Sequence, residues 1–102
     1  MNQAQLMAQV KKMQTEMAKA QEELANTTVS GTAGGGLVTV EVTCDQRVRG
    51  VKIGAEAVDP QDVETLEDLV VVAVNDALSK AAEASQKRMA SVTGGMRIPG
   101  LM

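Results

Sequence analysis

The sequence has no histidine, tryptophan, tyrosine or phenylalanine and only one cysteine among its 102 residues. Without histidine, neither a Ser-His-Asp nor a Cys-His catalytic relay can be built. One cysteine alone can neither hold a structural zinc ion nor close an intrachain disulfide. Without aromatic rings there is no platform on which bases could stack, as they do on single-strand and RNA-binding modules. We therefore expect a binding or assembly protein that is not an enzyme and needs no metal, cofactor or small-molecule substrate.

Long apolar runs are missing as well. No stretch reaches the roughly 18 consecutive apolar residues of a membrane-spanning helix. The first residues also lack the basic-then-apolar order of a signal peptide. We expect a single cytoplasmic domain over residues 1–102 with no membrane partner. Its core must be aliphatic and small, which makes oligomerisation a source of extra burial.

The patterning predicts an α+β fold with the element order α-β-β-β-α and short loops, which make the strands a three-stranded antiparallel meander. The expected elements are a helix over 1–25, strands over 27–33, 37–44 and 47–53, a helix over about 65–93, and an irregular tail over 96–102. At 1.5 Å per residue the helices would measure about 37 and 43 Å, against about 27 Å for the middle strand. We expect their free ends to project beyond the sheet and pair with each other.

The first helix carries apolar residues at alternating steps of four and three, which is the spacing of a seam that packs along another helix. The seam residues are Leu6, Val10, Met13, Met17, Ala20 and Leu24. Their expected partners on the last helix are Ala77, Ala81, Ala84, Met89 and Val92. The methionines are expected to fill gaps between the helices.

The middle strand alternates, with Val38, Val40, Val42 and Cys44 on one face. Cys44 is expected to be a small core residue. Gly50 lies where Val48 falls out of phase with the residues that follow, which indicates a β-bulge. The glycines at 34–36 stand between two strands, so we expect a hairpin loop and not a phosphate cradle.

Two signals compete for the start of the last helix. Asp59-Pro60 fits an N-cap followed by the first helical position. Thr65 to Asp68 resembles a capping box with aspartate in place of glutamate. We expect a short turn near 60–64 and the main helix after it.

Residues 69–74 of the last helix, LVVVAV, are apolar in almost every helical direction. A surface helix needs only one apolar stripe, so we expect this segment to be buried on two sides, by its own sheet and by a second copy. The expected homodimer interface consists of Leu69, Val70, Val72 and Ala73.

Charge is unevenly distributed along the chain. Residues 59–76 hold six acidic residues and no basic residue, whereas 77–93 hold three basic residues against one acidic residue. The helices together offer five cations that could contact DNA phosphates, read by charge and not by base: Lys11, Lys12, Lys80, Lys87 and Arg88. Lys19 and Arg97 are possible helpers. The competing interpretation is that these charges form ordinary solvated helix faces.

Three motifs carry a family resemblance: GGGLVTVEV at 34–42, LEDLVVVAVNDAL at 66–78 and TGGM at 93–96. With the element order, they resemble the YbaB/EbfC family of nucleoid-associated DNA-binding proteins. The resemblance implies a bacterial, cytoplasmic, tweezer-like homodimer, joined through its sheet region, whose paired terminal helices form the pincers. It implies binding to double-stranded DNA with low sequence specificity, affecting nucleoid organisation and gene expression. The alternative function is a helical clamp that grips another protein in the manner of a chaperone.

Overall fold

In the computed structural model, which describes residues 2–94, three strands lie between two helices in chain order. The elements are α1 (Gln3–Ala25), β1 (Thr28–Ala33), β2 (Val38–Thr43), β3 (Val48–Ile53) and α2 (Val63–Gly94), with short 3-10 turns at Gly34–Gly36 and Ala55–Ala57. The expected α-β-β-β-α order and the antiparallel meander β1-β2-β3 are confirmed. The expected irregular tail, 96–102, lies outside the described residues.

Both ends of α1 are closed by asparagine. The side chain of Asn2 accepts a 2.8 Å hydrogen bond from the backbone N–H of Gln5, and the Gln5 side chain accepts one from the Asn2 backbone, which completes a capping box. At the other end, the Asn26 amide donates to the carbonyl of Glu22 at 2.9 Å. These caps explain why the helix begins and ends where its sequence loses the helical pattern.

The sheet follows the predicted alternation. Val38, Val40, Val42 and Cys44 are all buried on one face. The predicted bulge is confirmed at Gly50, because Glu41 pairs with Gly50 whereas the next residue, Val42, pairs with Val48. The loop at 34–36 joins β1 to β2 as a hairpin connection, and all three of its glycines have positive φ values of 64°, 68° and 97°. That conformation is strained for any residue with a side chain.

The cap of α2 differs from the prediction. The Asp62 carboxylate accepts from the backbone N–H of Thr65 at 3.3 Å and from its hydroxyl at 2.6 Å, so Asp62 closes the helix. Asp59 caps the preceding turn instead, accepting from the N–H of Gln61 at 2.9 Å. The expected capping box at 65–68 is therefore wrong: those residues already lie inside the helix.

The first half of α2 packs on β1 and β2 through small residues. Ala73, Ala77 and Ala81, spaced four apart on one helix face, are fully buried in a cluster with the valines of β2. A Cβ atom at Gly31 of β1 would lie 2.2 Å from the backbone nitrogen of Ala77, so only glycine permits this approach. The prediction that Ala77 and Ala81 pack on the first helix is thus wrong, because both side chains pack against the sheet.

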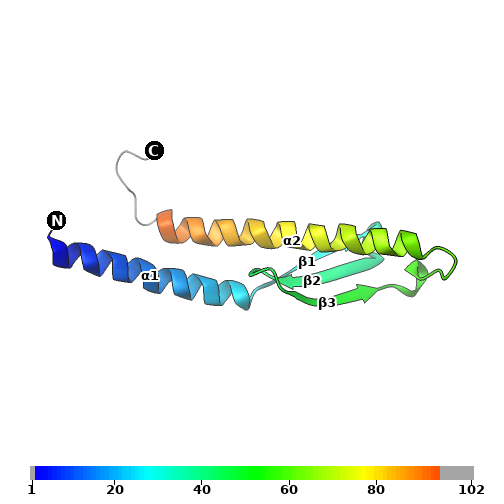
Figure 1. Ribbon diagram of the computed structural model, residues 1–102, viewed down its shortest axis with the longest axis horizontal. Coiled ribbons are helices and arrows are strands. Elements are labelled where there is room, and N and C mark those ends of the chain that lie inside the picture. Colours follow the sequence, from blue (N-terminus) through cyan, green and yellow to red (C-terminus); the bar gives the residue numbers. More distant parts are fainter. Residues whose placement is uncertain (1, 95–102) are drawn as a thin grey trace.

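The second half of α2 leaves the sheet and runs antiparallel beside α1 (Figure 1). α1 does not lie on the sheet but extends away from one end of it, so the described residues measure 70 × 26 × 16 Å. The predicted projection and pairing of the helices is confirmed. We call this projecting pair, α1 with the second half of α2, the arm.

Candidate nucleic-acid interface

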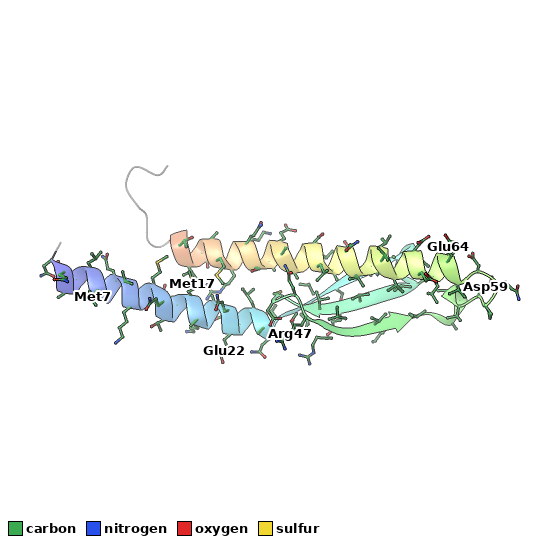
Figure 2. All side chains as sticks on the ribbon, in the orientation of Figure 1. Met7, Met17, Glu22, Arg47, Asp59 and Glu64 are labelled. Atoms are coloured by element: carbon green, nitrogen blue, oxygen red, sulfur yellow. The ribbon has the colours of Figure 1, made fainter. Side chains whose placement is uncertain are left out.

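The arm is held together by the predicted seam over only part of its length. Ala20 and Leu24 of α1 are buried, and Met13 and Met17 are half-buried. On α2, Val92 is buried and Met89 is half-buried. Met17 lies between the helices, whereas Met7 lies on the part of α1 that extends past the described end of α2 (Figure 2). The seam is therefore covered near the sheet and uncovered at the N-terminal end of α1.

An ion pair joins the two helices of the arm. The Nε atom of Arg88 donates to Oε2 of Glu23 at 2.8 Å, and Arg88 also donates to the Ser91 hydroxyl at 2.9 Å. The hydrogen bond from Arg88 lowers the pKa of Glu23, and the same contact raises the pKa of Arg88. Arg88 is thus a contact between the helices in the free protein.

Two further predicted DNA-contacting cations have partners on their own helix. Lys80 donates to the Asp76 carboxylate at 3.1 Å and to the carbonyl of Ser30 on β1 at 3.2 Å. Lys87 lies 3.6 Å from the Glu83 carboxylate, with both side chains largely exposed. Lys80 therefore fixes α2 to the sheet, while Lys87 forms a weak surface pair.

Lys11 and Lys12 differ from the other three. Both are exposed on the free end of α1, and neither forms an ion pair among residues 2–94. The five predicted residues thus form two groups, two cations near the tip of the arm and three closer to its base. The possible helper Lys19 is exposed on α1, and Arg97 lies outside the described residues.

Exposed cations on the sheet are a feature to which the sequence analysis gave no role. Arg47, Arg49 and Lys52 are all exposed and form no ion pair in the part of the chain that the structure describes. The lysines of α2 differ from them in having an acidic partner. Asp76 and Glu83 stand four residues before Lys80 and Lys87, at the spacing of ion pairs on one helix, and the sequence already shows this.

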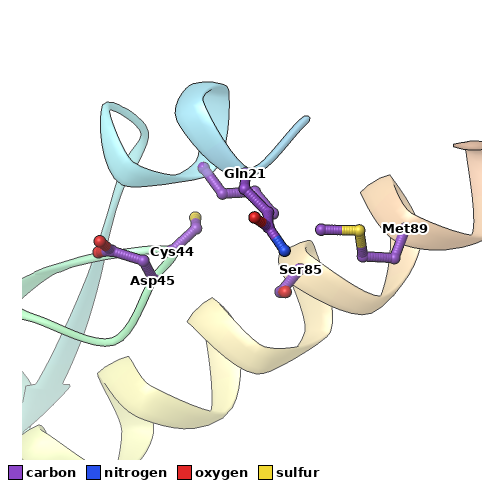
Figure 3. A pocket seen from close by; sticks show the side chains of 6 residues that line it. Gln21, Cys44, Asp45, Ser85 and Met89 are labelled. Carbon is purple, nitrogen blue, oxygen red and sulfur yellow. The ribbon is translucent and has the colours of Figure 1, made fainter. Parts of the chain in front are cut away.

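A small cavity of about 350 Å³ lies where the arm meets the sheet (Figure 3). Gln21 of α1 points toward Ser85 and Met89 of α2, and Cys44 lies on the turn after β2. Cys44 is buried, as predicted, and its N–H donates to the carbonyls of Leu24 and Thr27 at 3.1 and 2.8 Å. The cavity is therefore lined by α1, α2 and the turn after β2, at the end of the arm nearest the sheet. Within residues 2–94 no group of three or more metal-ligating side chains gathers.

The predicted dimer segment is only partly covered by its own chain. Ala73 is fully buried against the sheet, and Leu69 and Val70 are half-buried against the same core. Val71 and Val72 are 58% and 55% exposed, so the outer sides of the LVVVAV segment have no cover among the described residues. Val71 belongs to the segment that was expected to be buried on two sides, although it is not one of the four residues expected at the interface.

β3 presents a second uncovered apolar surface. Val48, Val51 and Ile53 pair with the buried residues Val42, Val40 and Val38, so they share the sheet face on which α2 lies. All three are nevertheless exposed, because α2 packs mainly over β1 and β2. We call these three residues the β3 face.

Comparison with known proteins assigns the chain to a family. The model of the YbaB/EbfC DNA-binding family matches residues 1–96. A nucleoid-associated protein of Chloroflexus aurantiacus is 50% identical over 97 residues, covering 95% of this chain and 97% of the relative. One from Bacillus thuringiensis is 53% identical over 87 residues, covering 85% and 80% of the two chains. The chain belongs to the YbaB/EbfC DNA-binding family, a family of nucleoid-associated proteins.

A solved structure supports the fold. An uncharacterized protein, HP0035 from Helicobacter pylori, superposes with a TM-score of 0.75 at 22% identity, covering 85% of this chain and 91% of that one. The α+β arrangement of two helices around an antiparallel meander is therefore shared beyond clear sequence similarity. No helix within residues 2–94 is long and apolar enough to span a membrane.

Proposed function

We propose that the protein binds double-stranded DNA in the bacterial nucleoid as a homodimer, through phosphates and with little sequence specificity, and so affects nucleoid organisation and gene expression. The observation that carries the proposal is the arm, a pair of helices extending from the sheet with the unpaired cations Lys11 and Lys12 at its free end. Flexible lysines on a helix suit phosphates as point charges and carry no base code.

The dimer would be joined through apolar surface that one chain leaves bare. The β3 face and the exposed Val71 and Val72 supply this surface, with Leu69 and Val70 contributing the parts that stay accessible. Ala73 is already buried in its own chain, so it would contribute by holding α2 against the sheet and not by contacting the second copy. A two-fold pairing would use the same patch on both copies.

The two groups of cations give the proposal a quantitative test. Each neutralised phosphate contributes about −0.9 to the slope of log affinity against log salt concentration. If only Lys11 and Lys12 of two copies contact phosphates, the slope is about −3.6; if all five cations of each copy do so, it approaches −9. A titration of a fluorescent duplex at several salt concentrations measures this slope.

The five cations are expected to act together in the strongest binding mode. Lys87→Glu with Arg88→Glu should abolish binding while the dimer persists. Because Arg88 also bonds to Glu23, Lys87→Glu alone, which leaves that contact between the helices intact, should weaken binding in the same direction. Affinity that ignores salt, or no affinity at low salt, would contradict the proposal. If the chain captures another protein, and this capture persists at high salt and after nuclease treatment, the result would favour the helical clamp instead.

A further inference from the structure

The described helices leave one face of the sheet uncovered. α2 packs on the face that carries the buried valines of β2, and α1 extends away from the end of the sheet (Figure 1). We call the opposite face the outer face. On β1 and β2 it consists of six polar residues in three cross-strand pairs: Thr28 with Thr43, Ser30 with Glu41, and Thr32 with Thr39. It therefore lacks the apolar patch that marks a contact with a protein or a membrane.

The bulge in β3 decides which of its residues join the outer face. Along a regular strand the side chains alternate, so Arg47 and Arg49 would point to one face and Lys52 to the other. The bulge at Gly50 makes Arg49 an extra residue and delays the alternation by one position. Lys52 consequently pairs with Thr39, on the outer face.

Both arginines lie on the same side as Lys52. The Thr43 N–H donates to the Arg47 carbonyl at 2.8 Å, and the Arg47 N–H donates to the Thr43 hydroxyl at 3.2 Å, so these two residues stand opposite each other. Arg49 follows Val48, which belongs to the β3 face, and therefore points to the outer face. The bulge thus sorts this strand into an apolar face and a cationic face.

Positive charge predominates on the outer face. Its three cations are exposed and form no ion pair within residues 2–94. Among the described strand positions of this face only Glu41 is acidic, and Asp45 on the adjoining turn accepts a hydrogen bond from the Thr43 hydroxyl. The chain as a whole has a net charge of −3, so this excess is a local property of the sheet. A cationic surface of this kind attracts polyanions.

We propose that the outer face is a second surface for the phosphates of double-stranded DNA, separate from the arm. Guanidinium groups bond phosphate oxygens in pairs, and serine and threonine hydroxyls donate to them as well. A dimer joined through the β3 face leaves this surface open, because the two faces of a strand point in opposite directions. The proposal rests on the proposed function, which supplies the duplex.

The arginine side chains report the contact directly. The sequence has four arginines, Arg47, Arg49, Arg88 and Arg97, so their Nε–H signals can be followed individually by NMR. Arg47→Lys and Arg49→Lys assign two of these signals and keep the charge. With a short duplex at low salt, we expect both signals to shift and added salt to reverse the shift. Unchanged signals while the duplex is bound would overturn this proposal alone, whereas no binding at low salt would overturn the proposed function itself.

Charge removal gives a second test. Arg47→Gln, Arg49→Gln and Lys52→Gln together remove six charges from a dimer and should make the salt slope of DNA binding less steep by up to about 5.4. The unfolding temperature should not change, because all three side chains are exposed. Charges on an edge strand also discourage pairing with other strands. An unchanged slope with increased self-association would assign the cations to that role and overturn the proposal.

A variant that gains affinity excludes misfolding as the cause. Glu41→Gln removes the acidic residue of the outer face and should tighten duplex binding at low salt at least about twofold. Glu64→Gln is the matched control, since it makes the same change in net charge at an exposed position of α2, on the other side of the sheet (Figure 2). Its affinity should stay near that of the parent. Equal gains in both variants would reduce the effect to net charge and overturn the proposal.

Discussion

Arg88 Nε lies 2.8 Å from Glu23 Oε2, and this bond joins residues 65 positions apart in the chain. It is the only ion pair that links α1 to α2 within residues 2–94. The same arginine was predicted to contact DNA. A phosphate that binds Arg88 must therefore compete with Glu23 or share the guanidinium with it, which ties DNA binding to the geometry of the arm.

The first prediction concerns acid. The hydrogen bond from Arg88 holds the pKa of Glu23 below its ordinary value of 4.5. A carboxyl with a lowered folded-state pKa stabilises the protein above its unfolded-state pKa, and that contribution is lost as the pH falls through the folded value. We expect the unfolding temperature to fall less steeply between pH 6 and pH 3 in Glu23→Gln than in the parent protein.

Glu22→Gln is the matched control for this prediction, because Glu22 is the exposed neighbour and forms no ion pair among residues 2–94. Its pH profile should follow that of the parent. Some acid sensitivity must remain in Glu23→Gln, since the backbone N–H of Thr32 and the Lys80 ammonium lower the pKa of Asp76. Identical profiles for Glu23→Gln and the parent would show that the ion pair does not stabilise the arm.

The second prediction separates the two groups of cations. Lys11→Gln with Lys12→Gln removes four charges from a dimer and should reduce the salt slope of DNA binding by about 3.6. Folding should be unaffected, because both side chains are exposed and unpaired in the described part of the chain. Lys80→Gln should instead lower the unfolding temperature, since it removes the bonds to Asp76 and Ser30. An unchanged slope in the double variant would exclude the arm tip from the DNA contact.

The third prediction tests the close approach of α2 to β1. Gly31→Ala places a Cβ atom 2.2 Å from Ala77 N and 2.4 Å from Ala73 O, and neither backbone atom can rotate away. We expect a loss of about 3 kcal/mol in the free energy of unfolding, measured in urea. Gly50→Ala is the control: no atom lies within 4 Å of the added carbon, so the loss should stay within about 1 kcal/mol.

The fourth prediction concerns the proposed dimer. Val51→Asp puts a charge on the β3 face and should give a folded monomer by sedimentation equilibrium. Lys52→Asp adds the same side chain one residue along the strand, where successive residues point to opposite faces, and should leave the dimer intact. A parent protein that sediments as a folded monomer would refute the dimer without either variant.

Local signals explain what could be predicted from the sequence. The alternation from Val38 to Cys44 and the bulge at Gly50 depend on neighbouring residues, and both are confirmed. Gly31 could not be recognised in advance, because its requirement comes from Ala77, far along the chain. The partner of Arg88 was hidden for the same reason: Glu23 becomes its neighbour only when the helices run antiparallel.

The cap of α2 was missed for a different, local reason. Asp59, Asp62 and Thr65 are all residue types that close helices, and the sequence offers them within seven positions. Propensity alone does not rank them. In the structure, the Asp59 carboxylate already bonds to the N–H of Gln61 in the preceding turn, which leaves Asp62 to receive the N–H of Thr65.

The side chains of α2 also cover part of one edge of the sheet. Asp76 accepts from the Thr32 N–H at 3.0 Å and Lys80 donates to the Ser30 carbonyl, so two of the outward backbone groups of β1 are occupied. β3 forms the other edge of the sheet. Because an edge strand with free backbone groups can pair with a strand of another chain, the occupied groups on β1 favour β3 as the edge at which a second sheet would add. A pair of sheets joined there would leave its two β1 edges outermost, and the side chains of α2 would hinder further growth by strand pairing.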